Sequence, residues 1–176
     1  MKNFFLEFFL NRFISGLPFA KIRLKLYSAY SFINLSSNVN ILTGCFIYRN
    51  GKISIGKNTV INKFCILDGR GGLKIGSNVS ISPECAIYTA GHDFQSKNFD
   101  NVLKEVIIED YCMIGPKVVI NPGVKLGYGT IVLGGSVVLK STGRGEIVGG
   151  SPAQLIGHRN IDDKLKYNTA WFPIGM

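Results

Sequence analysis

An aliphatic residue returns every six positions along most of the chain, in five sets of three. The sets are Leu35, Ile41, Ile47; Ile55, Ile61, Leu67; Ile75, Ile81, Ile87; Ile108, Ile114, Ile120; and Leu126, Val132, Val138. This period fits neither a helix, which repeats about every 3.6 residues, nor a single strand, whose side chains alternate. It predicts an all-β repeat architecture, a parallel β-helix of about five coils in which each six-residue segment is one short strand and a corner.

The spacing between the sets widens at one corner of the predicted coil. Two gaps between sets are eight residues long, whereas the gap from Ile87 to Ile108 is twenty-one residues. The long gap predicts a polar loop over 88–107 that is extruded from the coil. A long loop inside so regular an array is usually functional, and this one carries His92.

All four cysteines occupy a second repeated position, four residues after an aliphatic one, where a tight corner favours compact side chains. Cys45, Cys65 and Cys85 are spaced by twenty residues and form one predicted column, and Cys112 occupies the same slot. The chain has no CxxC pair. We therefore expect buried, reduced thiols of a cytosolic protein, and neither disulfides nor a metal site.

Residues 1–34 differ in kind from the repeat. They carry aromatic residues at helical spacing and then basic residues that alternate with aliphatic ones: Phe4, Phe5, Phe8, Phe9, Phe13, Lys21, Ile22, Arg23, Leu24, Lys25 and Leu26. The segment predicts a basic, amphipathic helical cap that is too short to span a bilayer and lacks the cleavage site of a signal peptide. One interpretation is that it only covers the open strand edge of the β-helix. The other is that it also contacts anionic lipid at the inner face of the cytoplasmic membrane.

Length and charge narrow the function classes. The 176 residues fit one compact unit with flanking pieces, and the net charge of +9 suits an anionic ligand or surface. Nucleic acid is not expected, because aromatic and basic residues do not interleave as in RNA-binding modules and no recognition helix is apparent. The stretch GKISIGK at 51–57 matches GxxxxGK but is followed by Asn58, where a P-loop has Ser or Thr, and GxGxxG is absent. Nucleotide binding of the P-loop or Rossmann kind is therefore not expected. We expect a cytoplasmic protein.

Three motifs accompany the hexads: YTAGHDF at 88–94, INPGVKLGYGTIVLGGSVVLK at 120–140 and GGSPAQLIG at 149–157. With them, residues 35–157 resemble the hexapeptide-repeat acyltransferases, in particular the galactoside and maltose acetyltransferases and their polysaccharide O-acetyltransferase relatives. The resemblance implies a left-handed coil, an exception to the usual right-handed crossover. It also implies a homotrimer with active sites between subunits, and acetyl-coenzyme A as the donor. We divide the chain into a cap (1–34), the β-helix (35–142) and a C-terminal tail at the coenzyme site (143–176).

The resemblance also implies residues that would act on the acceptor. His92 coincides with the family's catalytic histidine, and imidazole is suited to remove a hydroxyl proton near neutral pH. Its neighbour Asp93 either accepts a hydrogen bond in the site or caps the loop. Asn62 falls where sugar acetyltransferases place an acceptor-binding asparagine, although a ladder asparagine is the alternative. Arg70 aligns with a family carboxylate, and an anionic sugar would explain this reversal of charge.

A second group of residues is expected at the coenzyme. The residues are Gly115, Gly134 and Gly135 as walls of the pantetheine groove, and Lys140, His158 and Arg159 near the phosphates. The alternative is that these glycines are present only because the turns need their backbone freedom. Gln154 stands where the family has an arginine. Pro116 has no N–H to stabilise an oxyanion, so the amide of Gly134 or Gly135 is the expected donor.

The expected function is transfer of acetyl from acetyl-coenzyme A to a sugar hydroxyl in capsule, O-antigen or exopolysaccharide biosynthesis. Transfer would be direct, in a ternary complex, with His92 as general base. One alternative is N-acetylation of a nucleotide-linked amino sugar, and another is a trimeric scaffold without activity. The carbonic anhydrases that share this fold need three histidines on zinc, and this chain has only His92 and His158.

Overall fold

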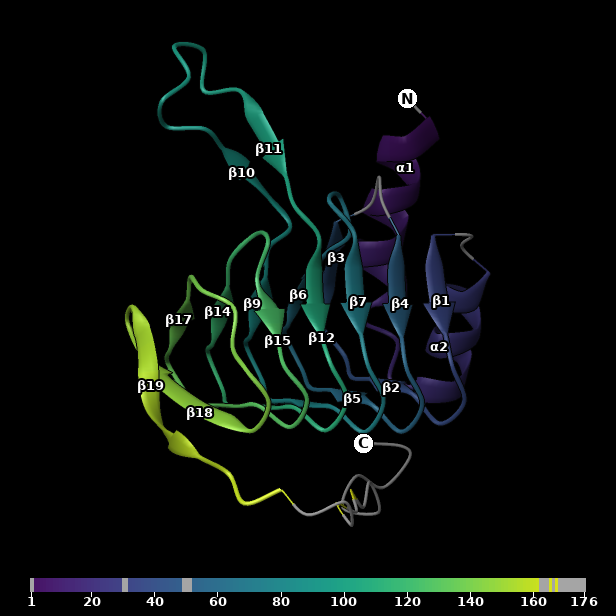
Figure 1. Ribbon diagram of the computed structural model, residues 1–176. Coiled ribbons are helices and arrows are strands. Elements are labelled where there is room, and N and C mark those ends of the chain that lie inside the picture. The colour runs from purple at the N-terminus through teal and green to yellow at the C-terminus, as the bar shows by residue number, and fades with distance from the viewer. Residues whose placement is uncertain (1, 30–31, 49–51, 162–164, 166, 168–176) are drawn as a thin grey trace.

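Three parallel sheets form the body of the protein in a computed structural model that describes residues 2–29, 32–48, 52–161, 165 and 167. The first face contains β1 (Ile33–Leu35), β4 (Ile53–Ile55), β7 (Leu73–Ile75), β12 (Val106–Ile108) and β15 (Lys125–Leu126). The second contains β2 (Asn40–Ile41), β5 (Val60–Ile61), β8 (Ser80–Ile81), β13 (Met113–Ile114) and β16 (Ile131–Val132). The third contains β3 (Phe46–Tyr48), β6 (Ile66–Asp68), β9 (Ala86–Ile87), β14 (Val119–Ile120) and β17 (Val137–Val138), so that each coil lies on the one before it (Figure 1).

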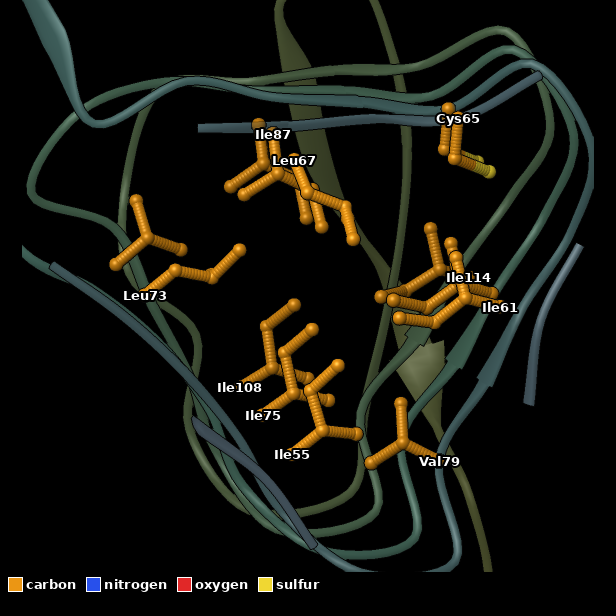
Figure 2. Packing of buried hydrophobic residues seen from close by; sticks show 14 of the residues in the cluster. Ile55, Ile61, Cys65, Leu67, Leu73, Ile75, Val79, Ile87, Ile108 and Ile114 are labelled. Carbon is orange, nitrogen blue, oxygen red and sulfur yellow. The ribbon is translucent and has the colours of Figure 1, made fainter. Parts of the chain in front are cut away.

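The register of the strands places the six-residue repeat inside the coil. Ile55 pairs with Ile75, and Ile75 pairs with Ile108, so these side chains form one buried column. Figure 2 shows such columns running up the triangular interior, with Leu67 and Ile87 in another. The period predicted from the sequence is therefore confirmed, because identical spacing repeats the same inward position in every coil.

The cysteines fill the compact positions beside these columns. Cys45, Cys65 and Cys85 are buried and free, and their thiols donate to the carbonyls of Asn62, Ser82 and Gly115 in the next coil, at 3.1, 3.3 and 3.1 Å. Burial raises the pKa of the Cys112 thiol to about 12, which keeps it protonated and unreactive near neutral pH.

The coil continues beyond residue 142, where the sequence pattern ended. Strand β18 (Glu146–Gly150) adds to the second face by pairing in parallel with β16, which brings Val148 beside Val132. β19 (Ala153–His158) then returns antiparallel to β18. The six-residue count missed β18 because segment 141–145 contains no aliphatic residue. Of the expected tail, residues 162–164, 166 and 168–176 lie outside the described residues.

Helices cover the open edge of the first coil. They are α1 (Lys2–Phe9), the π-helix η1 (Leu10–Ile14) and α2 (Ala20–Ser28), drawn in purple in Figure 1. The side-chain amide of Asn11 donates to the carbonyl of Ile47 at 3.0 Å and accepts from its N–H at 2.8 Å, as a neighbouring strand would. The guanidinium of Arg23 donates twice to the carbonyl of Ile41, at 3.1 and 2.7 Å, and once to that of Leu17. The bonds to Ile41 and Ile47 satisfy backbone groups of the first coil, which has no preceding coil to pair with.

The position of Arg23 corrects one expectation. The sequence pattern grouped it with Lys21 and Lys25 as one basic surface, but Arg23 is 1% exposed whereas both lysines are exposed. The reason is that the first coil presents unpaired carbonyls, which a guanidinium can bind through several donors at once. Among the described residues, no helix has the length and hydrophobicity needed to cross a bilayer.

The extruded loop is a two-stranded hairpin. It leaves the coil between β9 and β12, and consists of β10 (Ala90–His92) paired antiparallel with β11 (Asn101–Leu103). Figure 1 shows it projecting well clear of the coils. We call the place where it leaves, between the third and first faces, the hairpin corner. The predicted extrusion is thus confirmed, although the loop predicted over 88–107 ends sooner, because Val106 and Ile107 already belong to β12.

Replacing Arg23 by Met should destabilise the protein by about 1–3 kcal/mol, because the buried carbonyl of Ile41 and the partly buried carbonyl of Leu17 would lose their donors while the packing of the stem is kept. Urea unfolding followed by circular dichroism would measure the loss. Lys25→Met, on the exposed side of the same helix, is the matched control and should change stability by about 0.5 kcal/mol or less. Equal midpoints for the two variants would contradict this role.

Candidate active site

His92 is the last residue of β10, opposite Asn101 of β11. Its Nδ1 lies 2.7 Å from the carbonyl oxygen of Phe99. A carbonyl can only accept a hydrogen bond, so Nδ1 of the neutral ring carries the proton and Nε2 keeps its lone pair. The side chain is exposed, and this tautomer leaves Nε2 available to accept a proton from a bound molecule.

An open pocket of about 570 Å³ lies beside this imidazole. Its lining includes His92 and Gly91 from the hairpin, Lys104 from the returning leg, and Asn121 and Pro122 from the next coil. A pocket of this size suits a small ligand such as a sugar ring. The hairpin corner therefore combines a free proton acceptor with a cation and a polar amide.

The Asp93 side chain accepts a hydrogen bond within the hairpin tip. Its Oδ1 accepts from the N–H of Gln95 at 2.9 Å, and its own N–H donates to the carbonyl of Asp100 at 2.9 Å. The first bond is an Asx turn, which favours a reversal of the chain. Of the two roles expected for Asp93, capping the loop is the one this contact supplies.

Asn62 lies at a different corner, between the second and third faces. Its Nδ2 donates to the carbonyl of Ile81 at 3.0 Å, and its N–H bonds to the same oxygen at 2.9 Å. The side chain thus strengthens the ladder to the next coil. Within one chain, Asn62 and His92 are not brought to the same corner.

Arg70 lies at the hairpin corner, one coil before His92. Its Nε and Nη2 donate to the two carboxylate oxygens of Asp68 at 2.9 and 3.0 Å, and its guanidinium stacks on Tyr48 at 4.7 Å. Asp68 is 0% exposed, and burial would raise its pKa. Hydrogen bonds from Arg70 and from the N–H of Thr89 outweigh burial and hold the pKa of this carboxyl below its usual value.

Sequence reasoning missed Asp68 and Thr89. The available signal was a carboxylate directly after the inward-facing Leu67, where the strand ends and an insertion begins. An acidic residue at such a position is usually a turn residue, and only its hydrogen-bond partner shows that it is buried and structural. That partner, Thr89, comes from the next coil.

Gly115, Gly134 and Gly135 do gather, at the corner between the second and third faces, which we call the glycine corner. A Cβ on Gly115 would lie 2.5 Å from the nitrogen of Gly134, so no side chain fits between the two coils. Gly135 has a φ of +72° and open space beside it. Its N–H already donates to the carbonyl of Pro116 at 2.8 Å, which removes Gly135 from the expected oxyanion donors.

The other residues expected at the coenzyme are dispersed. Lys140 follows β17 at the hairpin corner, two coils beyond His92. His158 ends β19 opposite Glu146, and the guanidinium of Arg159 donates to the carbonyl of Tyr111 at 3.3 Å, at the corner between the first and second faces. One chain alone therefore places the imidazole and the glycines at separate corners.

The fold is shared with proteins of known class. A hexapeptide-repeat acetyltransferase from Vibrio cholerae superposes with a TM-score of 0.77 and 28% identity, over 87% of this chain and 88% of that one. In fold and in sequence, the chain resembles the hexapeptide-repeat acetyltransferases. The left-handed β-helix expected from the sequence is confirmed by this likeness. The Vibrio protein was also crystallised with acetyl-coenzyme A, and that structure superposes with a TM-score of 0.76 and 26% identity over 89% of this chain and 85% of that one.

Sequence relatives match shorter stretches. A Clostridium perfringens tetrahydropyridine-dicarboxylate N-acetyltransferase is 44% identical over 63 residues, which are 36% of this chain and 26% of that enzyme. A provisionally assigned colanic acid biosynthesis acetyltransferase of Escherichia coli is 29% identical over 113 residues, 64% of this chain and 51% of that protein. No protein-family model matches the sequence.

Proposed function

We propose that this protein transfers the acetyl group of acetyl-coenzyme A to a sugar hydroxyl in surface polysaccharide biosynthesis, with His92 as general base. The observation that carries the proposal is the imidazole on the hairpin: Nδ1 is bound to the carbonyl of Phe99, and the ring lines an open pocket. The Escherichia coli relative assigned to colanic acid biosynthesis supports a polysaccharide acceptor.

In the proposed reaction, Nε2 of His92 takes the hydroxyl proton as the acceptor oxygen attacks the thioester carbonyl. The Nδ1–H bond to Phe99 stabilises the imidazolium that results. The tetrahedral intermediate then collapses, the carbon–sulfur bond breaks, and the proton passes from Nε2 to the departing sulfur. The amide of Gly134 is the remaining expected donor to the oxyanion, and no covalent enzyme intermediate forms.

Acetyl-coenzyme A as donor is supported by the Vibrio complex and by the glycine corner. The gathered glycines leave an unobstructed strip on which a pantetheine arm could lie. Lys140, His158 and Arg159 are proposed to reach the phosphates, in keeping with the net charge of +9. We assign Asn62, Asp93 and Arg70 to binding of the acceptor. The ion pair with Asp68 holds the guanidinium of Arg70 in place.

N-acetylation of a nucleotide-linked amino sugar is the second candidate, and the Clostridium N-acetyltransferase favours it. An amine needs less help from a base than a hydroxyl does. Activity would then depend less steeply on pH near neutrality. Assays with matched hydroxyl and amino sugars, following release of free thiol, separate the two candidates.

Replacing His92 by Ala should lower the rate of acetyl transfer by about 10²- to 10⁴-fold, because the acceptor proton loses its base. The affinity for acetyl-coenzyme A should be nearly unchanged, since the glycine corner is untouched. Thiol release measures the first effect and calorimetry the second. Asn98→Ala, at an exposed position of the same hairpin, is the control and should retain activity. A His92→Ala rate above roughly a tenth of wild type would contradict the assignment.

A homotrimer would complete the site. His92 and the glycine strip lie at separate corners of one chain, and a threefold arrangement would set the hairpin of one subunit against the glycine corner of the next. Each active site would then take its base and its coenzyme groove from different chains.

Complementation between subunits tests this arrangement. His92→Ala and Gly134→Leu chains should each be inactive, the second because a side chain blocks the strip beside Pro116. Mixed trimers, formed by unfolding and refolding the two together, should regain activity, because some interfaces then combine an intact hairpin with an intact strip. Light scattering would verify the trimer. Mixed trimers that stay inactive, or an active monomer, would refute the shared site.

Peripheral contact with the cytoplasmic membrane is proposed for the helical cap. Phe8, Phe13 and Ile22 are each more than half exposed, and Lys21 and Lys25 are exposed on α2. Aromatic and aliphatic side chains flanked by lysines suit an anionic lipid surface, where a lipid-linked glycan would be found.

Changing Lys21 and Lys25 to Gln should weaken sedimentation with phosphatidylglycerol vesicles and lower activity on lipid-linked glycan, yet leave acetylation of a small soluble sugar unchanged. Arg23 is kept because it is buried in the cap. Wild-type binding should weaken with salt, since exposed charges are screened within about 8 Å at physiological ionic strength. Lys57→Gln with Lys117→Gln removes two charges elsewhere and should bind normally. Wild type that fails to bind at low salt would exclude membrane contact.

A further inference from the structure

A buried polar cluster lies beneath the hairpin, beside a core that is largely aliphatic. The Asp68 carboxylate accepts four hydrogen bonds: from the N–H of Arg70 at 3.0 Å, from its Nε and Nη2 at 2.9 and 3.0 Å, and from the N–H of Thr89 at 2.9 Å. Four donors saturate the acceptor capacity of a carboxylate. The ionised group is therefore held in one orientation.

Thr89 connects this carboxylate to both legs of the hairpin. It lies directly before β10, and its hydroxyl donates to the carbonyl of Asp68 at 3.0 Å and accepts from the N–H of Gly71 at 2.8 Å. Its carbonyl accepts from the N–H of Lys104, which follows β11, at 2.9 Å. Gly71 packs so closely on this carbonyl that a Cβ there would clash with it. Thr89 and Asp68 are both 0% exposed, so their side chains are shielded from water.

We propose that Asp68 and Thr89 are positioning residues for His92, in an inference that rests on the proposed function. The paired strands of the hairpin begin directly after Thr89, with Ala90 opposite Leu103 and His92 opposite Asn101. The hairpin itself is largely exposed and lacks a core of its own. The link at its base sets the direction in which the hairpin leaves the coil, and with it the position of the imidazole relative to the bound acceptor and donor.

The position of the His92 imidazole matters because transfer requires the acceptor oxygen, as it loses its proton, to attack the thioester carbon. A shift of about 1 Å in a reacting group can lower a rate by about 100-fold. Asp68 and Thr89 would act on the rate through the hairpin, without touching the substrate. The coenzyme strip at the glycine corner is independent of them.

Thr89→Val tests the proposal, because valine keeps the shape of the side chain and removes the hydroxyl. We expect the turnover rate to fall by about 10-fold or more, with the KM for acetyl-coenzyme A changed by about twofold or less. Thr89→Ser, which keeps the hydroxyl, should restore most of the rate. Asp68→Asn should lower the rate further, because it also releases Arg70, which we assigned to the acceptor; Thr89→Val is therefore the variant that decides the positioning role.

Thr59→Val is the matched control. Thr59 is also 0% exposed, and its hydroxyl donates to the carbonyl of Gly76 at 2.8 Å and accepts from the N–H of Val79 at 3.2 Å. It lies at the corner between the first and second faces, away from the hairpin. This variant should lose as much thermal stability as Thr89→Val but keep the wild-type turnover rate. An equal loss of rate in both variants, or none in Thr89→Val, would overturn the positioning role.

Hydrogen exchange supplies a readout that does not depend on activity. Amides over 90–103 should exchange faster in Thr89→Val than in wild type, and should be unchanged in Thr59→Val. Unchanged exchange in Thr89→Val would show that Thr89 does not hold the hairpin. A wild-type protein without transferase activity on any sugar would overturn the proposed function, and the exchange result would then still decide whether Thr89 holds the hairpin.

Discussion

Coil-on-coil stacking is the constraint on which the rest of the structure depends. Each turn buries only a few aliphatic side chains and pairs its backbone only with the turns above and below, so no single coil is stable alone. Both ends must therefore be closed. Asn11 and Arg23 bind the backbone of the first coil with side-chain groups, and β18 with β19 extends the second face at the other end.

The same constraint explains where chemistry can be added. A residue inserted within a strand would shift every later side chain to the wrong face, whereas a corner can lengthen without disturbing the ladders. The hairpin uses this freedom between β9 and β12, and the first face simply resumes, with Ile75 beside Ile108. Its attachment is polar and buried. In a medium of low polarity the saturated Asp68 carboxylate has one favourable arrangement, which makes a firm base for an exposed element.

Under the proposed function, a single chain would carry two half-sites. At the hairpin corner, the imidazole has a free lone pair and lines a pocket, and at the glycine corner the glycines leave a strip without side chains. The first corner joins the third and first faces, and the second joins the second and third faces. A triangular prism places its corners apart by construction. Packing prisms around a threefold axis is the simplest way to bring unlike corners together, and this is the physical basis for proposing an active site between subunits.

The sequence by itself determined the repeat, the buried columns, the free cysteines and the place of the hairpin, because a strict period forces every coil to present the same inward position. It also pointed to His92 and to the gathered glycines. Only the tertiary structure decided which polar groups are buried and which partners they bond to. Arg23 is buried, Gly135 has its amide occupied, and Asp68 and Thr89 form the base of the hairpin. Each of these depends on a partner from another coil or from the cap, and burial of a polar residue is stable only when that partner is present.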